Sequence, residues 1–300
     1  MNPALYSAAE TFIWQNARLI DRHLFARLFC QGPLDPIIVT LKAYQNPDGG
    51  FGQALEPDNR CPASQPIFVE TALHILDRSD ALRDARVQAE LLLPACDYLA
   101  SIATQAGGVP FVLPSANPYL HTPWMGAPDH PPAALNPTAS IAGLLLKAGL
   151  RHPWVEAASA YCWQEIAASQ SEGFHDILPM VTFLENAPQR PQAALQLERI
   201  AARVRSKHLV ELDPKAGGYV QLPLDWAPQP ASFFRPFFDG DTIRLHLSAL
   251  AARQRPDGGW PISWDTVSPA AEAEWRGLVT LNALATLHAY EQAGFPAGTS

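Results

Sequence analysis

The sequence predicts an all-α fold built from pairs of helices. Apolar residues recur at helical spacing along most of the 300 residues, and no segment shows the sustained alternation of a strand. Hydrophobic residues make up 48% of the chain and charged residues 17%, which is enough for a substantial core. Glycine turns at positions 49, 107, 173, 217 and 258 each follow a helical run. We therefore expect a helix pair at every turn and a single domain over residues 1–300.

Two of these turns form an internal repeat, QNPDGGF at 45–51 and QRPDGGW at 254–260. In Pro-Asp-Gly-Gly, proline presets φ, aspartate bonds its own backbone and glycine accepts a positive φ, so the motif reverses the chain. We expect each copy to end one helix and to present an aromatic ring just beyond it.

The predicted helices begin and end at recognisable signals. Gly32-Pro33 stops the first helix, and Asp35 caps the second, which has Pro36 in its first turn. A proline-rich loop over 109–135 and an aromatic, proline-rich stretch over 219–238 interrupt the helical pattern, and so long a loop is usually functional. The expected helices are 4–30, 34–44, 64–77, 84–104, 136–149, 153–170, 174–186, 190–208, 241–253 and 275–291.

Charge, cysteine spacing and hydropathy limit the partners and cofactors that we expect for the protein. A net charge of −8 and a pI near 5.5 provide no basic surface for phosphates, so we expect no nucleic-acid partner. The four cysteines are widely spaced and lack CxxC spacing, as expected for reduced thiols. No apolar run approaches membrane-spanning length, so the prediction is a cytoplasmic protein with no transmembrane segment. We find no zinc-site pattern and no phosphate-binding glycine loop, and therefore expect no metal and no cofactor.

The two strong turns resemble the glutamine-tryptophan repeats of squalene and hopene cyclases and the related repeats of protein prenyltransferase β-subunits. Gln45, Gly49 and Phe51 carry this resemblance in the first copy, and Gln254 and Trp260 stand at the matching ends of the second. The resemblance implies an α/α toroid of about five to six helix pairs, with an inner ring, an outer ring and an apolar pocket along the axis. It also implies a small apolar or isoprenoid ligand. A shared fold does not by itself transfer an activity.

The first catalytic candidates lie in FDGDT at 238–242, which resembles the DxDD motif of class II terpenoid cyclases. The resemblance implies that Asp241 protonates an alkene or epoxide, with Asp239 as its partner. Phe234 and Phe238 would bind the substrate, keep the acid protonated and stabilise a carbocation. However, the third acidic position is a threonine, and the motif starts an outer helix where the cyclase acid starts an inner one. The alternative is that Asp241 only caps the helix that follows.

The second candidates are carboxylates in loops after the two strong turns. Glu56 and Asp265 occupy equivalent places in the two repeats, and in the toroid such loops border the mouth of the pocket. Asp58, Glu272 and Glu274 would converge with them there, and Trp264 would bind the substrate beside them. Paired carboxylates can separate their pKa values and act as acid and base. The alternative is that acids near helix N-termini are favoured by the helix dipole alone.

Four further residues are candidates for the predicted site. His175 begins an inner helix and would face the same mouth as a base, or it serves as a structural hydrogen-bonding group. Trp124 belongs to the long loop, which is either a substrate-binding lid or an inert connection. Arg276 and Arg235 are the two cations that we would consider for a diphosphate.

Three function hypotheses follow. The first is a terpenoid-cyclase-like enzyme, of the isomerase or lyase class, that acts on or binds an isoprenoid and starts cyclisation by protonation. The second is a carbohydrate-active α/α-barrel enzyme that uses the carboxylates at the mouth, with His175 beside them. The third is a non-catalytic toroid that binds an apolar ligand, a second copy of itself or a partner subunit.

Overall fold

The computed structural model describes residues 2–295, in which helices are the regular structure and only two isolated β-bridges occur. The predicted all-α class is therefore confirmed. Contacts group the chain into two compact units. Unit 1 combines Met1–Gly32 with Val204–Ser300, and unit 2 is the continuous segment Pro33–Arg203.

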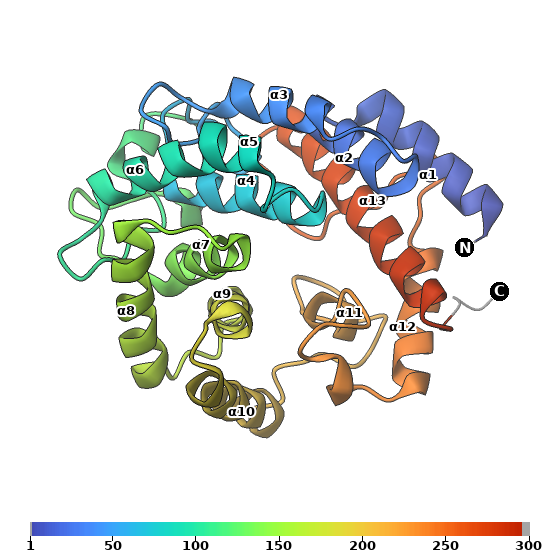
Figure 1. The fold of residues 1–300 in the computed structure, drawn as a ribbon. Coiled ribbons are helices and arrows are strands. Elements are labelled where there is room, and N and C mark those ends of the chain that lie inside the picture. The colour runs from blue at the N-terminus through green and yellow to red at the C-terminus, as the bar shows by residue number, and fades with distance from the viewer. Residues whose placement is uncertain (1, 296–300) are drawn as a thin grey trace. The chain divides into compact units, whose positions relative to one another are not determined.

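Unit 2 holds the helices of the middle of the chain (Figure 1). Most match the predicted ranges, and Gly149 ends α7 in the left-handed conformation at φ 71°. The predicted cap at Asp35 is wrong, because Leu34 is the N-cap of α3, no side chain caps it, and Asp35 is the first helical residue, with Pro36 after it. The elements are α3 (Asp35–Tyr44), α4 (Pro66–Arg78), α5 (Ala85–Val87), a π-helical turn (Gln88–Leu92), α6 (Leu93–Ile102), α7 (Leu135–Ala148), α8 (Pro153–Ala168), α9 (Phe174–Asn186) and α10 (Arg190–Ser206), which runs on into unit 1.

Unit 1 contains both ends of the chain, and the prediction of one helix over 4–30 is wrong for it. The helix breaks at Ala17 and Arg18, whose backbones are extended. Side chains compensate for the break: Arg22 Nε donates to the Ala17 carbonyl at 2.7 Å, and Arg18 binds the buried Asp21 at 2.7 Å. The helices of this unit are α1 (Pro3–Asn16), α2 (Leu19–Phe29), α11 (Pro223–Trp226), α12 (Gly240–Ala252) and α13 (Pro269–Gln292).

The glutamine of each strong turn ties that turn to another helix of its own unit. Gln45 Nε2 donates to the carbonyls of Gly49 at 2.9 Å and Leu91 at 3.0 Å. Gln254 Nε2 donates to those of Gly258 and Leu5, both at 2.9 Å. We call each such turn, 45–51 and 254–260, a glutamine clasp. The second clasp joins α12 to α1, so the first helix of the chain completes the last repeat.

Glycine is required at the clasps because the backbone of the bound helix lies directly against it. Gly49 and Gly258 have φ of +87° and +91°, and a Cβ on either would collide with the carbonyl oxygen of Pro94 or Ala8. Each of these carbonyls lies three residues after the one that binds the glutamine. Gly107 packs in the same way against α8 at φ +93°, but the side-chain bond differs: the Thr104 hydroxyl donates to the carbonyl of Gly108 within the same turn.

The two remaining predicted turns are built differently. Gly173 has an ordinary φ of −71° and is the N-cap of α9, while the Arg203 guanidinium binds the carbonyls of Ser169 and Ser171. Gly218 has φ +83°, but no neighbouring group lies within 4 Å of the position of a Cβ. These turns reverse the chain without the close backbone contact of a clasp.

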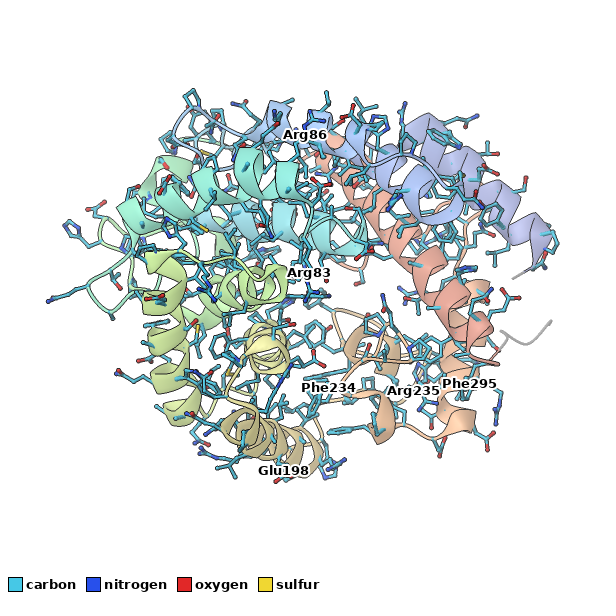
Figure 2. The ribbon with its side chains drawn as sticks, viewed as in Figure 1. Arg83, Arg86, Glu198, Phe234, Arg235 and Phe295 are labelled. Carbon is cyan, nitrogen blue, oxygen red and sulfur yellow. The ribbon has the colours of Figure 1, made fainter. Side chains whose placement is uncertain are left out.

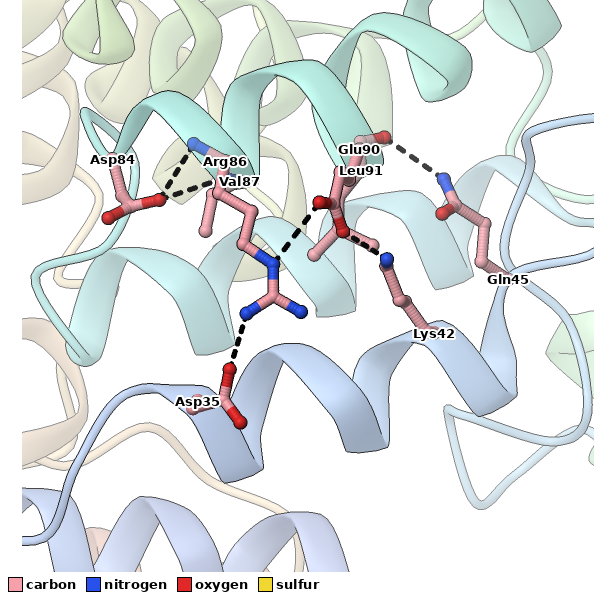
Figure 3. A network of polar contacts seen from close by, with 8 residues as sticks. All are labelled: Asp35, Lys42, Gln45, Asp84, Arg86, Val87, Glu90 and Leu91. Atoms are coloured by element: carbon pink, nitrogen blue, oxygen red, sulfur yellow. Dashed lines mark hydrogen bonds and ion pairs between the residues drawn. The ribbon is translucent and has the colours of Figure 1, made fainter.

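A network of ion pairs supports the first clasp (Figure 3). Glu90, in the π-helical turn, pairs with Lys42 of α3 and with Arg86, which in turn pairs with Asp35. The charged groups of these pairs are about 40% exposed or more, so each pair contributes little stability by itself. The network instead sets the position of α3 along the segment whose Leu91 carbonyl accepts from Gln45.

The stretch 219–238 is irregular and aromatic, as predicted. It contains α11 and a 3-10 turn, Arg235–Phe237. Phe234 is buried and packs edge-on against Trp226, with ring centres 4.8 Å apart. Arg235 lies over the ring of Phe295 at 5.0 Å, and both are labelled in Figure 2. This segment is therefore an aromatic core of unit 1.

Candidate functional site

Helices α4, α7 and α9 of unit 2 run in parallel and share a polar face. His74 of α4 bonds Ser140 of α7, and three residues further along α4 Asp77 binds Lys147 of α7. Both pairs advance from N- to C-terminus, which requires parallel helices. His175, at the start of α9, interacts electrostatically with Glu70 of α4, and Glu185, at the end of α9, interacts with Lys147 of α7. All three helices thus contribute polar groups to one face.

Glu70, His74, Ser140 and His175 form what we call the Glu70 cluster. Glu70 Oε1 lies 3.8 Å from His74 Nε2, one helical turn further along α4. The same His74 nitrogen lies 3.0 Å from Ser140 Oγ of α7. His175, at the start of α9, interacts electrostatically with Glu70. Glu70 therefore lies beside one imidazole and acts electrostatically on a second.

The two histidines are accessible, whereas the groups that position them are covered. The His74 side chain is 48% exposed and the Glu70 side chain 12%. Ser140 is 1% exposed, so its hydroxyl orients His74 and is not available as a nucleophile. Ser140 and Glu70 also approach the same ring nitrogen, which differs from a Ser-His-Asp triad, where serine and carboxylate bind opposite nitrogens.

The environment keeps His175 neutral. Burial lowers the pKa of His175, and this effect outweighs the nearby carboxylates of Asp176 and Glu70, which raise it. The ring is solvent-accessible, so protein atoms surround it without covering it. Ser171 Oγ donates to Asp176 at 2.6 Å and holds that carboxylate beside the ring. A neutral, accessible imidazole next to a carboxylate can act as a general base.

A second group of charges, Asp77, Lys147 and Glu185, lies toward the C-terminal ends of the same helices. Lys147 Nζ binds Asp77 at 2.6 Å. Burial raises the pKa of Glu185, and Lys147 partly offsets that rise. The polar face therefore carries donors and acceptors along more than one helical turn.

Of the predicted site residues in unit 2, only His175 belongs to the Glu70 cluster. Glu56 and Asp58 are buried, at 8% and 4% exposure, in the loop after the first clasp. Glu56 Oε2 accepts from the Asp58 backbone N–H at 2.9 Å, and the Thr122 N–H donates to the Asp58 carbonyl. This loop thereby pairs with the 109–135 loop, on which Trp124 is 52% exposed.

The surroundings expected for Asp241 are not present. Its side chain is 92% exposed and pairs with Arg244, so no apolar environment keeps it protonated. The predicted helix cap also lies elsewhere: Asp239 Oδ1 accepts from the Thr242 N–H at 2.7 Å. Hydrogen bonds from the Thr242 backbone and side chain lower the pKa of Asp239, which keeps it ionised.

The other predicted residues of unit 1 have mainly packing roles. Phe234 and Phe238 are buried, at 1% and 7% exposure. Trp264 packs edge-on against two rings, those of Tyr219 and Trp275.

The Arg276 side chain contacts residues of the second clasp and of α1. It binds Asp257 at 2.8 Å and lies 4.7 Å over the Phe12 ring. Asp265 is exposed and Glu274 is partly exposed. Glu56 belongs to unit 2 and Asp265 to unit 1, so their convergence stays a prediction.

Sequence reasoning missed Glu70, His74 and Ser140. The signal available was the spacing of Glu70 and His74, four residues apart in a predicted helix and therefore on one face. A further missed group is Asp225 of α11, whose pKa is raised by burial although hydrogen bonding to the Leu222 N–H lowers it.

Comparison with known proteins gives no assignment: no protein-family model and no curated protein matches the chain. Within residues 2–295, no helix has the length and apolar character to cross a membrane. The same residues bring together no group of three His, Cys, Asp or Glu side chains that could hold a metal ion.

Proposed function

We propose that the protein is an acid–base enzyme acting on a polyhydroxylated, carbohydrate-like substrate at the polar face of α4, α7 and α9. The observation that carries the proposal is the Glu70 cluster, in which Glu70 lies 3.8 Å from the accessible His74 and acts electrostatically on the accessible His175. His175 is the base, and His74, held by Ser140 and Glu70, is the acid. The proposal keeps the carbohydrate hypothesis, but Glu70 replaces the loop carboxylates Glu56 and Asp265 as the carboxylate of the site.

The chemistry of the face fits such a substrate. Sugar hydroxyls both donate and accept hydrogen bonds, and the Lys147–Asp77 pair presents a donor and an acceptor side by side. His175 is neutral near neutral pH because its pKa lies below the ordinary value of 6.5. A base of this kind removes a proton while an acid on the neighbouring helix supplies one.

The resemblance also leads us to propose that the helix pairs close into an α/α toroid whose inner helices include α4, α7 and α9. The repeated glutamine clasps support this arrangement, since each ties one helix pair to the next helix of its unit.

The test is a substrate screen with matched variants. Glucose, galactose, mannose and N-acetylglucosamine would be followed by NMR in D2O for proton exchange and epimerisation, and their p-nitrophenyl glycosides for hydrolysis. Glu70→Gln and His175→Asn should each lower the observed rate about a hundredfold or more. Asp241→Asn, an exposed carboxylate outside the cluster, is the control. No turnover of any sugar, or unchanged rates in both variants, would sink the proposal.

Isoprenoid cyclisation is the second candidate, and Asp225 is the observation that favours it. The Asp225 side chain is exposed, but surrounding protein atoms raise the pKa of its carboxyl, and the next residue, Trp226, belongs to the aromatic segment. Asp225 therefore replaces Asp241 as the acid in this candidate. Incubation with squalene and prenyl diphosphates should give cyclised hydrocarbons that disappear in Asp225→Asn and persist in Asp241→Asn. The reverse pattern, or no product, would exclude Asp225 as the acid.

A further inference from the structure

A second surface of unit 2 has the features of a small-molecule site. A cleft of about 440 Å³ lies between the end of α7, one face of α8, the end of α9 and the connection from α9 to α10. This volume is within the range of about 300 to 1,000 Å³ that is typical of ligand pockets. No residue of the Glu70 cluster lines this cleft, so it is a separate place on the unit.

The interior of the cleft is mostly apolar. Leu146 and Leu150 come from the end of α7, and Phe183 of α9 adds an aromatic wall. Trp163 of α8 packs edge-on against Phe183, with ring centres 5.3 Å apart. An apolar chain or ring placed here would exchange water for side-chain contacts on several sides.

Polar side chains without partners surround this apolar interior. The buried Trp163 indole N–H has no acceptor among the described residues. Arg151 and Gln189 line the cleft, are exposed, and make no side-chain hydrogen bond or ion pair within residues 2–295. The one carboxylate at the cleft, Glu156, is exposed in the first turn of α8. The Arg151 guanidinium and the Trp163 N–H can only donate, whereas the Gln189 amide both donates and accepts, so the two donors favour a ligand with an accepting polar end.

We propose that this cleft binds a small amphipathic carboxylate, with its apolar part between Leu146, Phe183 and Trp163 and its carboxylate at Arg151. The guanidinium forms charge-assisted, bidentate hydrogen bonds with a carboxylate, and the indole N–H supplies a further donor. The proposal does not depend on the chemistry of the Glu70 cluster.

Calorimetry with three ligands of the same chain length tests both the apolar contact and the carboxylate contact of the proposed site. Octanoate, 1-octanol and octylamine share the apolar part and differ only in the polar end. We expect octanoate to bind tightest, then octanol, then octylamine. Tighter binding of octylamine would assign the polar end to Glu156 and overturn the proposal, as would failure of all three to bind.

Variants locate the site. Arg151→Gln should weaken octanoate about tenfold and leave octanol unchanged, because only the carboxylate uses the charge. Trp163→Phe should weaken octanoate about fivefold through the lost N–H donor. Ala160→Trp, from an exposed position that lines the cleft, should remove binding of both.

Arg255→Gln, an exposed arginine of unit 1, is the matched control, and circular dichroism establishes that each variant is folded. Octanoate binding that is unchanged in Arg151→Gln and Trp163→Phe would overturn the proposal even if Ala160→Trp failed to fold.

Discussion

The clasp after α3 and the clasp after α12 use the same backbone contacts but different side-chain partners. In both, aspartate accepts from the N–H of the second glycine, at 2.9 Å for Asp48 and 3.0 Å for Asp257. The second partner differs: Asp48 accepts from the Ser64 hydroxyl at 2.7 Å, whereas Asp257 pairs with the guanidinium of Arg276 at 2.8 Å.

The comparison separates what a clasp requires from what it tolerates. Both copies bury the ring that follows the glycines, with Phe51 and Trp260 each 1% exposed. The glutamine, the glycines and the ring are common, while the partner of the aspartate changes from neutral to charged. The backbone contact is therefore the essential part, and the aspartate needs only a donor nearby.

The largest loss of unfolding free energy should come from adding a methyl group to the first glycine of a clasp. Gly49→Ala and Gly258→Ala combine a positive φ with a collision against a carbonyl oxygen, and each should lower the free energy of unfolding by about 3 kcal/mol or more. Gly218→Ala, at φ +83° with nothing near the new methyl group, should cost only about 1 kcal/mol. Urea denaturation measures all three, and equal costs would show that the helix contact is not the essential part.

Removing the glutamine amide should have the next largest effect. Gln45→Leu leaves the Leu91 carbonyl without its donor, and Gln254→Leu does the same to Leu5. Each should cost about 1 to 3 kcal/mol of unfolding free energy. Gln192→Leu, at an exposed position of α10, is the control. If the clasp variants match this control in thermal unfolding, the glutamine is dispensable.

The partners of the aspartates should respond differently to salt. Arg276→Met removes an ion pair and a cation contact over Phe12, and should cost about 1 kcal/mol at low salt and less at high salt. Ser64→Ala removes a neutral donor, and its cost, also about 1 kcal/mol, should be the same in both. Denaturation at two salt concentrations checks this, and identical salt responses would erase the distinction between the clasps.

The smallest effect concerns pH. Burial raises the pKa of Asp257, but hydrogen bonds from Arg276 and the Gly259 N–H lower it more, so it lies below its ordinary value of 3.8. The folded protein therefore holds this proton less tightly than the unfolded chain. The stabilisation is present above pH 3.8 and is lost as the pH falls through the lowered pKa. Asp257→Asn should slightly reduce the loss of unfolding free energy between about pH 4 and lower pH. An unchanged dependence of unfolding free energy on acid pH would contradict the lowered pKa.

Local chemistry made most helix positions predictable. Pro36 and Gly149 mark helix ends by backbone preferences that act within a few residues, and the structure follows them, although the cap predicted at Asp35 lies at Leu34. The helix break at Ala17 has no glycine or proline beside it. The side chains of Arg22 and Arg18 stabilise it instead, so the local sequence did not indicate that the helix ends there.

The Glu70 cluster depends on contacts between helices, which the sequence does not display. The spacing of Glu70 and His74 could be read from a predicted helix, but the neighbours Ser140 and His175 could not, since they come from two other helices. At 239–242, the sequence offered Asp241 as the cap, whereas in the structure the Asp239 carboxylate caps the helix and Asp241 pairs with Arg244.

The bond between Gln254 and the Leu5 carbonyl has a consequence for synthesis of the chain. The groups that complete unit 1 are separated by most of the sequence, whereas unit 2 is continuous over Pro33–Arg203. We expect unit 2 to acquire its structure while the ribosome is still translating, and α1 to wait for its partner until the last repeat emerges. Limited proteolysis of stalled nascent chains tests this order: protection of α1 before residue 254 is made would contradict it.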